Sequence, residues 1–332
     1  MTRLDASAPG KLMVSGEYAV LDGAVAVVAS VSARVYVRWS SASSSRSPGA
    51  SGGSPQSLSD YREAEETRRL AEEQAGAVQG QLVVDATQMR SAGQVKYGLG
   101  SSAAAAAATA GAILASQGHD LTDAQVQRRA FELALAGHKA IAPQGSGADV
   151  AAASLGGFVR FRLENGHVAE AERLRWPSGV HTRVVWTGKA ARTSEFVGKV
   201  RQFEASQPKA FGLIRDSLHA EAQRFADAIG AGHPAEIVEG AGAYGVTMKR
   251  LGEGANVSIV TPELQLIADL ARQHGGAAKP SGAGGGDVAI AFFASENNAE
   301  AFDAACRSAS LVLLDLGLGA PGVRPETTYP GD

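Results

Sequence analysis

The stretch Lys96-Tyr97-Gly98-Leu99-Gly100-Ser101-Ser102, followed by six alanines over 103–108, decides how this chain folds. Its two glycines adopt positive φ angles without steric cost, so they predict a tight turn that can approach a ligand closely. The two serines and the alanine-rich sequence up to Gln117 predict a helix that the serines cap. The unpaired N–H groups and the dipole at the start of such a helix favour a bound anion, phosphate in particular.

Two further groups in this stretch suit phosphate chemistry. A serine hydroxyl at the start of the helix can bind Mg2+, and Lys96 adds a positive charge beside the turn. A turn that leads into a capped helix is also common in proteins that bind nothing there. The stretch alone therefore leaves both a phosphate site and a plain capped helix open.

The composition bounds the class of protein. A length of 332 residues, 45% hydrophobic and 20% charged, predicts a globular chain with one large or two medium domains. A net charge of −3 gives no overall attraction to nucleic acid or to acidic membranes, so an anion site must be local. Cys306 is the only cysteine, and no signal peptide or membrane span is recognisable. We expect a cytoplasmic protein without nucleic-acid or membrane partners, and a homodimer stays open.

The order of predicted elements indicates an α+β fold with two lobes. Strands are expected over 8–15, 24–39, 81–86, 158–163, 180–187 and 288–293, with a further extended segment over 17–21. Helices are expected over 61–77, 103–117, 123–136, 149–155, 261–273 and 298–309, with three more before about 252. Residues 40–59 are rich in serine, glycine and proline and predict a disordered loop. A change to helix-rich sequence near residue 175 predicts two domains, 1–175 and 176–332.

A second candidate for phosphate chemistry is Lys11, which follows the Pro-Gly turn at the start of the first predicted strand. Lysine is a compact point charge and suits a transferring phosphoryl group or a substrate oxygen. An exposed lysine at a strand edge is the other interpretation.

A third candidate lies in the segment 144–151, where Asp149 opens a predicted helix after a tight glycine turn. Its carboxylate could orient or deprotonate a hydroxyl nucleophile, or simply favour the start of the helix. His138, just before this segment, could be a core, a surface or a site residue, and the sequence does not decide among them.

The segment 279–287 is the third glycine-rich region, with four glycines within the five positions 282–286. Such a run costs backbone entropy, which a close backbone approach should offset. We expect this loop to lie against a ligand or against the first glycine loop. Asp287 could serve only to hold the shape of the loop.

Three other nucleotide-binding classes are excluded by missing motifs. The chain has no Gly-X4-Gly-Lys-Ser/Thr loop, no Gly-X-Gly-X-X-Gly after its first strand and no His-Arg-Asp with Asp-Phe-Gly. It is therefore neither a P-loop kinase, nor a typical dinucleotide enzyme, nor a protein kinase.

Taken together and in this order, three segments resemble the galactokinase, homoserine kinase, mevalonate kinase and phosphomevalonate kinase (GHMP) superfamily. They are Ala8-Pro9-Gly10-Lys11 with Gly16-Glu17, then Gly98 to Ala104, then Ser281 to Asp287. They span residues 8 to 293 with the spacing of the family, which is far more specific than any one loop.

Within the superfamily, further features resemble the phosphomevalonate kinase branch. These are Lys96, the segment Gln144 to Ala151, Trp186-Thr187-Gly188 with Thr193 and Val197, and the segment Lys279 to Asp287. Mevalonate kinases usually carry a Mg2+-binding glutamate eleven positions before the catalytic aspartate, where this chain has His138. That departure weakens a mevalonate kinase interpretation and leaves the metal ligands uncertain.

The resemblance implies a fold and a reaction. The N-terminal domain would be like a domain of a ribosomal small-subunit protein, and the C-terminal domain would be ferredoxin-like. The enzyme would transfer the γ-phosphoryl group of ATP, with Mg2+, to 5-phosphomevalonate, giving 5-diphosphomevalonate in isoprenoid precursor synthesis. Alternatives are a mevalonate kinase or another kinase of the superfamily, a diphosphomevalonate decarboxylase, and a non-catalytic ATP-binding protein.

The resemblance also assigns roles to residues of this chain. The catalytic residues would be Lys11, Lys96 and Asp149, and the metal ligand would be Ser102. The ATP site would comprise Gly98, Leu99, Gly100, Ser101, Ser102 and Ala103. The acceptor site would comprise Ser15, Glu17, Tyr18, His138, Lys139, Ser146, Gly147, Arg192, Ser281, Gly282, Ala283, Gly284, Gly285 and Asp287. Lys189 is a further candidate cation for the acceptor.

Overall fold

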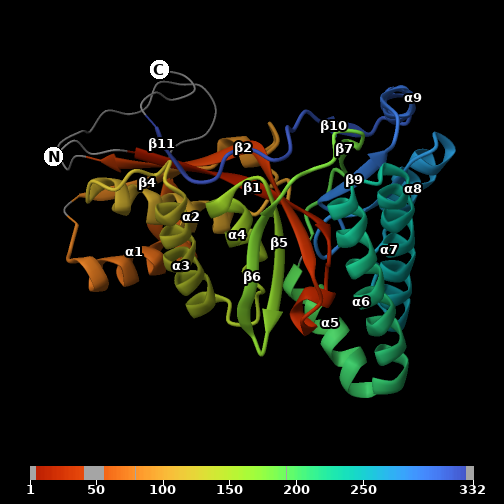
Figure 1. The fold of residues 1–332 in the computed structure, drawn as a ribbon, viewed down its shortest axis with the longest axis horizontal. Coiled ribbons are helices and arrows are strands. Elements are labelled where there is room, and N and C mark those ends of the chain that lie inside the picture. The colour runs from red at the N-terminus through yellow and green to blue at the C-terminus, as the bar shows by residue number, and fades with distance from the viewer. Residues whose placement is uncertain (1–4, 41–55, 79, 192, 327–332) are drawn as a thin grey trace.

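The structure is a computed structural model that describes residues 5–40, 56–78, 80–191 and 193–326. It contains two lobes, each built around an antiparallel sheet (Figure 1). In Figure 1 the N-terminal lobe lies on the left and the C-terminal lobe on the right. This arrangement confirms the predicted α+β fold.

The sheet of the N-terminal lobe is organised by one long strand. Strand β2 (Ala26–Ser40) pairs with β1 (Asp5–Ser15) along its length, with β5 (Phe158–Glu164) at its start and with β4 (Gln81–Asp85) at its end. The short β3 (Gln56–Ser57) extends the β4 edge, and β6 (His167–Leu174) forms a hairpin with β5. The register of β1 against β2 shifts near Lys11 and again near Ser15.

Four helices cover this sheet. Helices α2 (Ser101–Ser116) and α4 (Ala148–Leu155) pack on the strands, and α1 (Arg62–Ala75) and α3 (Ala124–Ile141) pack on them. The six alanines of α2 are almost completely buried, since a helix that is apolar on every side must be enclosed. Their small side chains let the helix approach both the sheet and its neighbouring helices.

The sheet of the C-terminal lobe has the order β10 (Val312–Leu314), β7 (His181–Trp186), β9 (Val288–Phe293), β8 (Ala277–Pro280). Strand β9 is buried at every position because helices cover both of its faces. Ile290 and Phe292 face α6 (Pro208–Ala231) and α7 (Pro234–Gly254), whereas Ala291 and Phe293 face α8 (Pro262–Gln273) and α9 (Glu296–Ser308). Helix α5 (Thr193–Ser206) precedes α6 and contacts the N-terminal lobe, where its Arg201 pairs with Asp22 (3.4 Å).

The end of the described chain returns to the N-terminal lobe. Strand β11 (Arg324–Glu326) pairs with β1, so a division of the chain at residue 175 leaves out this crossing. Buried Arg34 of β2 fixes the returning segment, since its guanidinium donates to the carbonyls of Pro321 (2.8 Å) and Gly322 (2.7 Å).

Three local expectations were wrong. Residues 17–21 are not extended, because the chain turns through the 3-10 helix η1 (Ala19–Asp22), which Gly23 ends at φ 90°. Helix α3 continues past 136 to Ile141. The predicted disordered loop over 40–59 lies mostly outside the described residues, but its end forms β3 and part of η2 (Leu58–Asp60).

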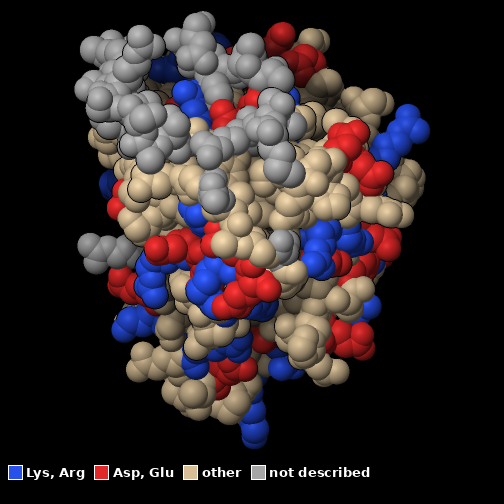
Figure 2. All heavy atoms as spheres, turned by 90° about the vertical axis from the view of Figure 1, so that its left-hand side faces the viewer, with Lys and Arg blue, Asp and Glu red and all other residues tan. Residues whose placement is uncertain are grey.

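On the face shown in Figure 2, basic and acidic side chains are intermixed. None of the helices in the described part of the chain combines the length and apolar character that a bilayer crossing needs.

Candidate active site

The first glycine loop has the predicted backbone but not the predicted cap. Gly98 and Gly100 have φ values of 83° and 75°, and Gly100 is itself the residue that caps α2. Ser101 and Ser102 lie inside the first turn, and no side chain caps the helix, so the expected serine cap was wrong. The N–H groups of this first turn therefore remain available to an anion.

Lys11 lies directly against this loop. Its backbone N–H donates to the carbonyl of Leu99 (2.8 Å), which ties β1 to the turn. Its side chain covers Gly100 so closely that a Cβ there would lie 3.0 Å from the Lys11 Cγ. The Nζ also lies near Gly282 of the third glycine loop, so this cation stands between both loops.

A cavity of about 480 Å3 opens beside Lys11. Asp149 and Ser146 line it from the start of α4, His138 from α3, Glu17 and Tyr18 from the segment after β1. The C-terminal lobe contributes the start of α5 and residues 282–283. Segments far apart in the sequence therefore meet around one space, with a lysine and an aspartate on its walls.

Asp149 is held by the local fold of α4. Gly147 caps this helix at φ 86°, and the Asp149 Oδ1 accepts from the N–H of Val150 (2.9 Å). Ser146 accepts from the N–H of Ala148 (3.2 Å), which fixes the turn before the helix. The carboxylate stays half-buried at the cavity wall.

Because α3 continues to Ile141, His138 lines the cavity and Lys139 lies beside it without lining it. The Lys139 Nζ donates to the carbonyl of Gly145 (2.7 Å), and burial lowers its pKa. The His138 Nδ1 lies 3.1 Å from the Glu63 Oε2. Burial disfavours a charged imidazole, but Glu63 and the charge of Asp149 outweigh that effect and raise the pKa of His138.

The third glycine loop contacts the first, as one of the two expectations stated. A Cβ on Gly98 would lie 2.5 Å from the Asp287 Cβ, so the two loops touch. The Asp287 Oδ1 accepts from the N–H of Ala191 (2.9 Å). Burial raises the pKa of Asp287, and that N–H and the charge of Lys11 partly offset the effect. Asp287 thus shapes the loop and lies at the junction of the two loops.

A buried ion pair joins the lobes beside the cavity. The Lys279 Nζ is bonded to the Glu17 Oε1, and both side chains are almost fully buried. Burial lowers the pKa of Lys279, which the charge of Glu17 counteracts. The Tyr244 hydroxyl donates to the Glu17 carbonyl (2.8 Å). The Glu17 Oε2 is buried without a partner among the described residues.

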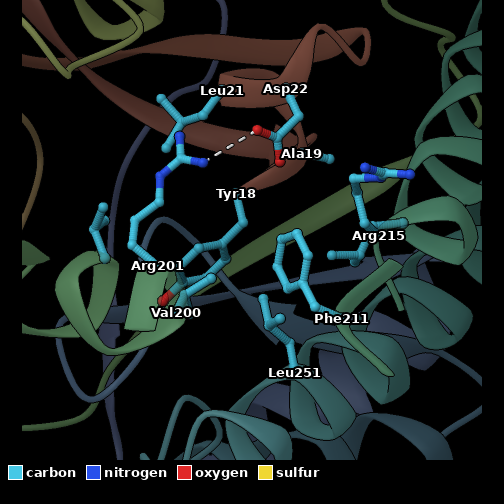
Figure 3. A pocket seen from close by; sticks show the side chains of 11 residues that line it. Tyr18, Ala19, Leu21, Asp22, Val200, Arg201, Phe211, Arg215 and Leu251 are labelled. Carbon is cyan, nitrogen blue, oxygen red and sulfur yellow. Dashed lines mark hydrogen bonds and ion pairs between the residues drawn. The ribbon is translucent and has the colours of Figure 1, made fainter. Parts of the chain in front are cut away.

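Tyr18 makes a second connection between the lobes. Its hydroxyl donates to the carbonyl of Ala283 (2.5 Å), and its φ of 61° is unusual for a residue with a side chain. Tyr18 lines both the cavity and a hollow of about 20 Å3, where Phe211 and Leu251 face it (Figure 3). Desolvation raises the Tyr18 pKa, so the hydroxyl stays a neutral donor.

Other predicted site residues lie elsewhere. Lys96 is exposed and does not line the cavity, and the Lys189 Nζ pairs with Glu263 outside it. Ser15 and Ser281 are buried with hydroxyls that have no partner among the described residues. Arg192 lies outside the described residues.

Sequence reasoning missed three contributors, namely Glu63, Lys279 as a buried charge, and Tyr244. Lys279 was quoted only as part of a motif, and its neighbours in the sequence did not mark it as a buried charge. Glu63 and Tyr244 lie in ordinary helical sequence, so nothing in their surroundings marked them.

The donor set suits a nucleotide-bound metal better than a protein-only metal site. Among the described residues, no group of three or more His, Cys, Asp or Glu side chains is arranged to hold an ion. Mg2+ commonly binds one or two protein oxygens together with nucleotide phosphates. The half-buried Ser102 hydroxyl, in the first turn of α2, fits such a role.

Lys11 lies between the first glycine loop and a cavity that Asp149 also lines, and this arrangement is typical of a class of small-molecule phosphotransferases. The family model described as the GHMP kinases N terminal domain matches residues 65–157, and that described as GHMP kinases C terminal matches residues 225–310. The matches together cover more than half of the chain. The chain belongs to the GHMP kinase family, whose members use ATP.

Three similar proteins illustrate the relationship. A phosphomevalonate kinase of Streptomyces sp. (strain CL190) is 29% identical and covers 87% of this chain and 89% of its own. A mevalonate kinase of Thermococcus sibiricus is also 29% identical, covering 86% of this chain and 87% of its own. A Streptococcus pneumoniae phosphomevalonate kinase, solved with phosphomevalonate and AMPPNP, has a TM-score of 0.77 at 20% identity and covers 95% and 99% of the two chains. The last match confirms the fold.

Proposed function

We propose that this chain transfers the γ-phosphoryl group of ATP to the phosphate of 5-phosphomevalonate, giving 5-diphosphomevalonate and ADP. The observation that carries the proposal is that Lys11 lines the cavity together with Asp149 and also covers Gly100 of the first glycine loop. The similarity to the Streptomyces phosphomevalonate kinase supports this choice of acceptor.

The residues have distinct roles in this proposal. The N–H groups at the start of α2 hold the β- and γ-phosphates, and Lys11 neutralises charge that builds on the transferred group. Asp149 orients the acceptor. Ser102 and the nucleotide would hold Mg2+, which would supply further charge neutralisation. Little covalent chemistry is required of the protein, since phosphoryl transfer depends mainly on positioning and electrostatics.

The charge of the acceptor determines whether the enzyme needs a general base. A phosphate monoester has its second pKa at about 6, so it is largely ionised at neutral pH and needs no general base. An alcohol acceptor must lose its proton during transfer, so Asp149 would then act as a general base as well as orient the acceptor.

Mevalonate kinase activity is the second candidate. The Thermococcus sibiricus mevalonate kinase is 29% identical to this chain, the same value as for the Streptomyces phosphomevalonate kinase. The test measures ADP release from Mg-ATP with 5-phosphomevalonate, mevalonate and homoserine as separate acceptors. Turnover with 5-phosphomevalonate alone supports the proposal. Turnover with mevalonate alone contradicts the acceptor assignment and supports Asp149 as a general base.

A further inference from the structure

Tyr18 has a backbone conformation that residues with side chains rarely adopt. Its φ is 61° and its ψ is −54°, and across it the N–H of Ala19 donates to the carbonyl of Glu17 (2.7 Å). This is the γ-turn of positive φ, which is rare and strained. All five other described non-glycine residues with positive φ are Asn, Asp, Gln or Ser, so Tyr18 is the one bulky side chain among them. Such strain persists only where surrounding contacts hold the residue in place.

Contacts with the C-terminal lobe hold Tyr18 in this turn. Its ring lies beside Phe211 of α6 and Leu251 of α7 (Figure 3). Its hydroxyl donates to the carbonyl of Ala283 in the third glycine loop (2.5 Å). A glycine at position 18 would adopt the same backbone without strain, but it could make neither contact. The side-chain contacts in the other lobe therefore offset the strain of the turn.

The neighbouring Glu17 binds the other end of the same loop segment. Its Oε1 is bonded to the Lys279 Nζ, and both side chains are almost completely buried. Lys279 and Ala283 lie four positions apart in the sequence. The dipeptide Glu17-Tyr18 therefore fixes the segment 280–282 at both ends.

The segment held in this way runs past the ammonium group of Lys11. A Cβ on Gly282 would lie 3.9 Å from the Lys11 Nζ. Gly282 and Ala283 also line the cavity that Asp149 borders. On its other side, the stem of Lys11 covers Gly100. The place of the ammonium therefore depends on how closely residue 282 approaches it.

We propose that Tyr18 is a positioning residue that sets the place of the Lys11 ammonium at the cavity. Its hydroxyl holds residues 282–283, and these residues limit where the ammonium can lie. The strained turn keeps the hydroxyl where it reaches the loop. The inference rests on the proposed function for the role of Lys11, and it adds the residue that directs this cation. Charge stabilisation of a transition state depends on such placement, because a displaced group stabilises it less.

The first experiment removes only the hydroxyl bond. Tyr18→Phe should lower kcat with 5-phosphomevalonate about five- to tenfold, the usual effect of one net hydrogen bond. The KM for ATP should change little, because the hydroxyl does not touch the first glycine loop. Tyr61→Phe is the matched control, since the buried Tyr61 donates its hydroxyl to the Gln56 Oε1 (2.8 Å) away from the cavity. A wild-type kcat in Tyr18→Phe overturns the proposal.

A double-mutant cycle separates positioning of Lys11 from general damage. Residues that act through one another have non-additive effects. In a Lys11→Met background the ammonium is already absent, so adding Tyr18→Phe should lower kcat by less than about twofold. An equal loss in the two backgrounds overturns the proposal, because the hydroxyl would then act independently of Lys11.

Hydrogen exchange tests the contact without any acceptor. The N–H groups of Ser281 and Gly285 are both hydrogen-bonded, so their exchange reports opening of the third glycine loop. Exchange at both positions should be faster in Tyr18→Phe than in the wild type and unchanged in Tyr61→Phe. Unchanged exchange in Tyr18→Phe contradicts the proposed role of Tyr18 whatever the acceptor. Absence of wild-type turnover with 5-phosphomevalonate contradicts the proposed function instead.

The strain in the turn has its own measurement. At an ordinary position alanine is more favourable than glycine, because glycine loses more conformational freedom on folding. At position 18 only glycine adopts the observed backbone freely, so Tyr18→Gly should unfold at the same or a higher denaturant concentration than Tyr18→Ala. The ordinary order, with Tyr18→Ala clearly more stable, would show that the turn is not strained and would remove this support.

Discussion

The loops 98–102 and 281–286 are both rich in glycine, yet their glycines face different neighbours. In the first loop, Gly100 is covered by the stem of Lys11, and the N–H groups of α2 follow it directly. In the third loop, Gly284 and Gly285 are enclosed by Ile259 and Phe196 of the same lobe.

This difference explains what each loop can do. The first loop ends in a helix start, so its geometry leaves donors for an anion. The glycines at 284–286 allow tight packing, and only residues 282–283 reach the cavity. Glycine content alone therefore does not distinguish a ligand-binding loop from a packed one, whereas the element that follows the loop does.

The entry to the third loop should be the most damaging place to change. Lys279→Met leaves the Glu17 carboxylate buried without its cation, which typically costs about 3–5 kcal/mol of unfolding free energy. Chemical denaturation measures this loss, with the exposed Lys209→Met as control. Adding Glu17→Gln to Lys279→Met should recover much of the stability. A Lys279→Met variant that unfolds at the wild-type denaturant concentration contradicts the prediction.

Lys11 tests the contact between the two loops. Lys11→Met keeps a flexible stem over Gly100 but removes the charge that, in the proposed function, faces the transferred group. We expect kcat to fall about 10²- to 10³-fold, as for the loss of one electrostatic stabiliser of a transition state. Steady-state kinetics with 5-phosphomevalonate check this value, with the exposed Lys199→Met as control. A kcat within threefold of the wild type would show that Lys11 does not act on the reacting group.

Paired glycine substitutions test the comparison directly. Gly285→Ala forces a Cβ into Phe196 at a φ of 76°, so we expect a loss of about 2 kcal/mol in unfolding free energy with little change in the KM for ATP. Gly100→Ala presses on Lys11 and should raise the KM for ATP about tenfold, a smaller free-energy change.

The Gly285 variant has an internal control. Phe196→Leu combined with Gly285→Ala should recover the part of the loss that is due to overlap, but not the backbone strain. If Gly285→Ala weakens ATP binding as much as Gly100→Ala does, the third loop also holds the nucleotide and the distinction between the loops is wrong.

The sequence was informative where one residue type has one physical explanation. The alanine run predicted a helix, and Gly98 and Gly100 predicted positive φ angles, because few other structures suit those residues. It failed where the partner is distant in the chain. Glu63 lies 75 positions before His138, and Glu17 lies 262 positions before Lys279, so no local pattern indicates either pair.

Asp149→Asn is expected to have an effect as small as that of Gly100→Ala, and its size distinguishes a phosphate acceptor from an alcohol. Asp149→Asn keeps the side-chain oxygen that accepts from the Val150 N–H, so the start of α4 should persist. With an acceptor that is already ionised, Asp149 only orients it, and kcat should fall about tenfold and well under a thousandfold. A loss above a thousandfold in a variant that retains the wild-type unfolding transition would mean that a proton is removed during transfer. The acceptor would then be an alcohol, as in a mevalonate kinase, and the geometry of the first glycine loop would be the same for either acceptor.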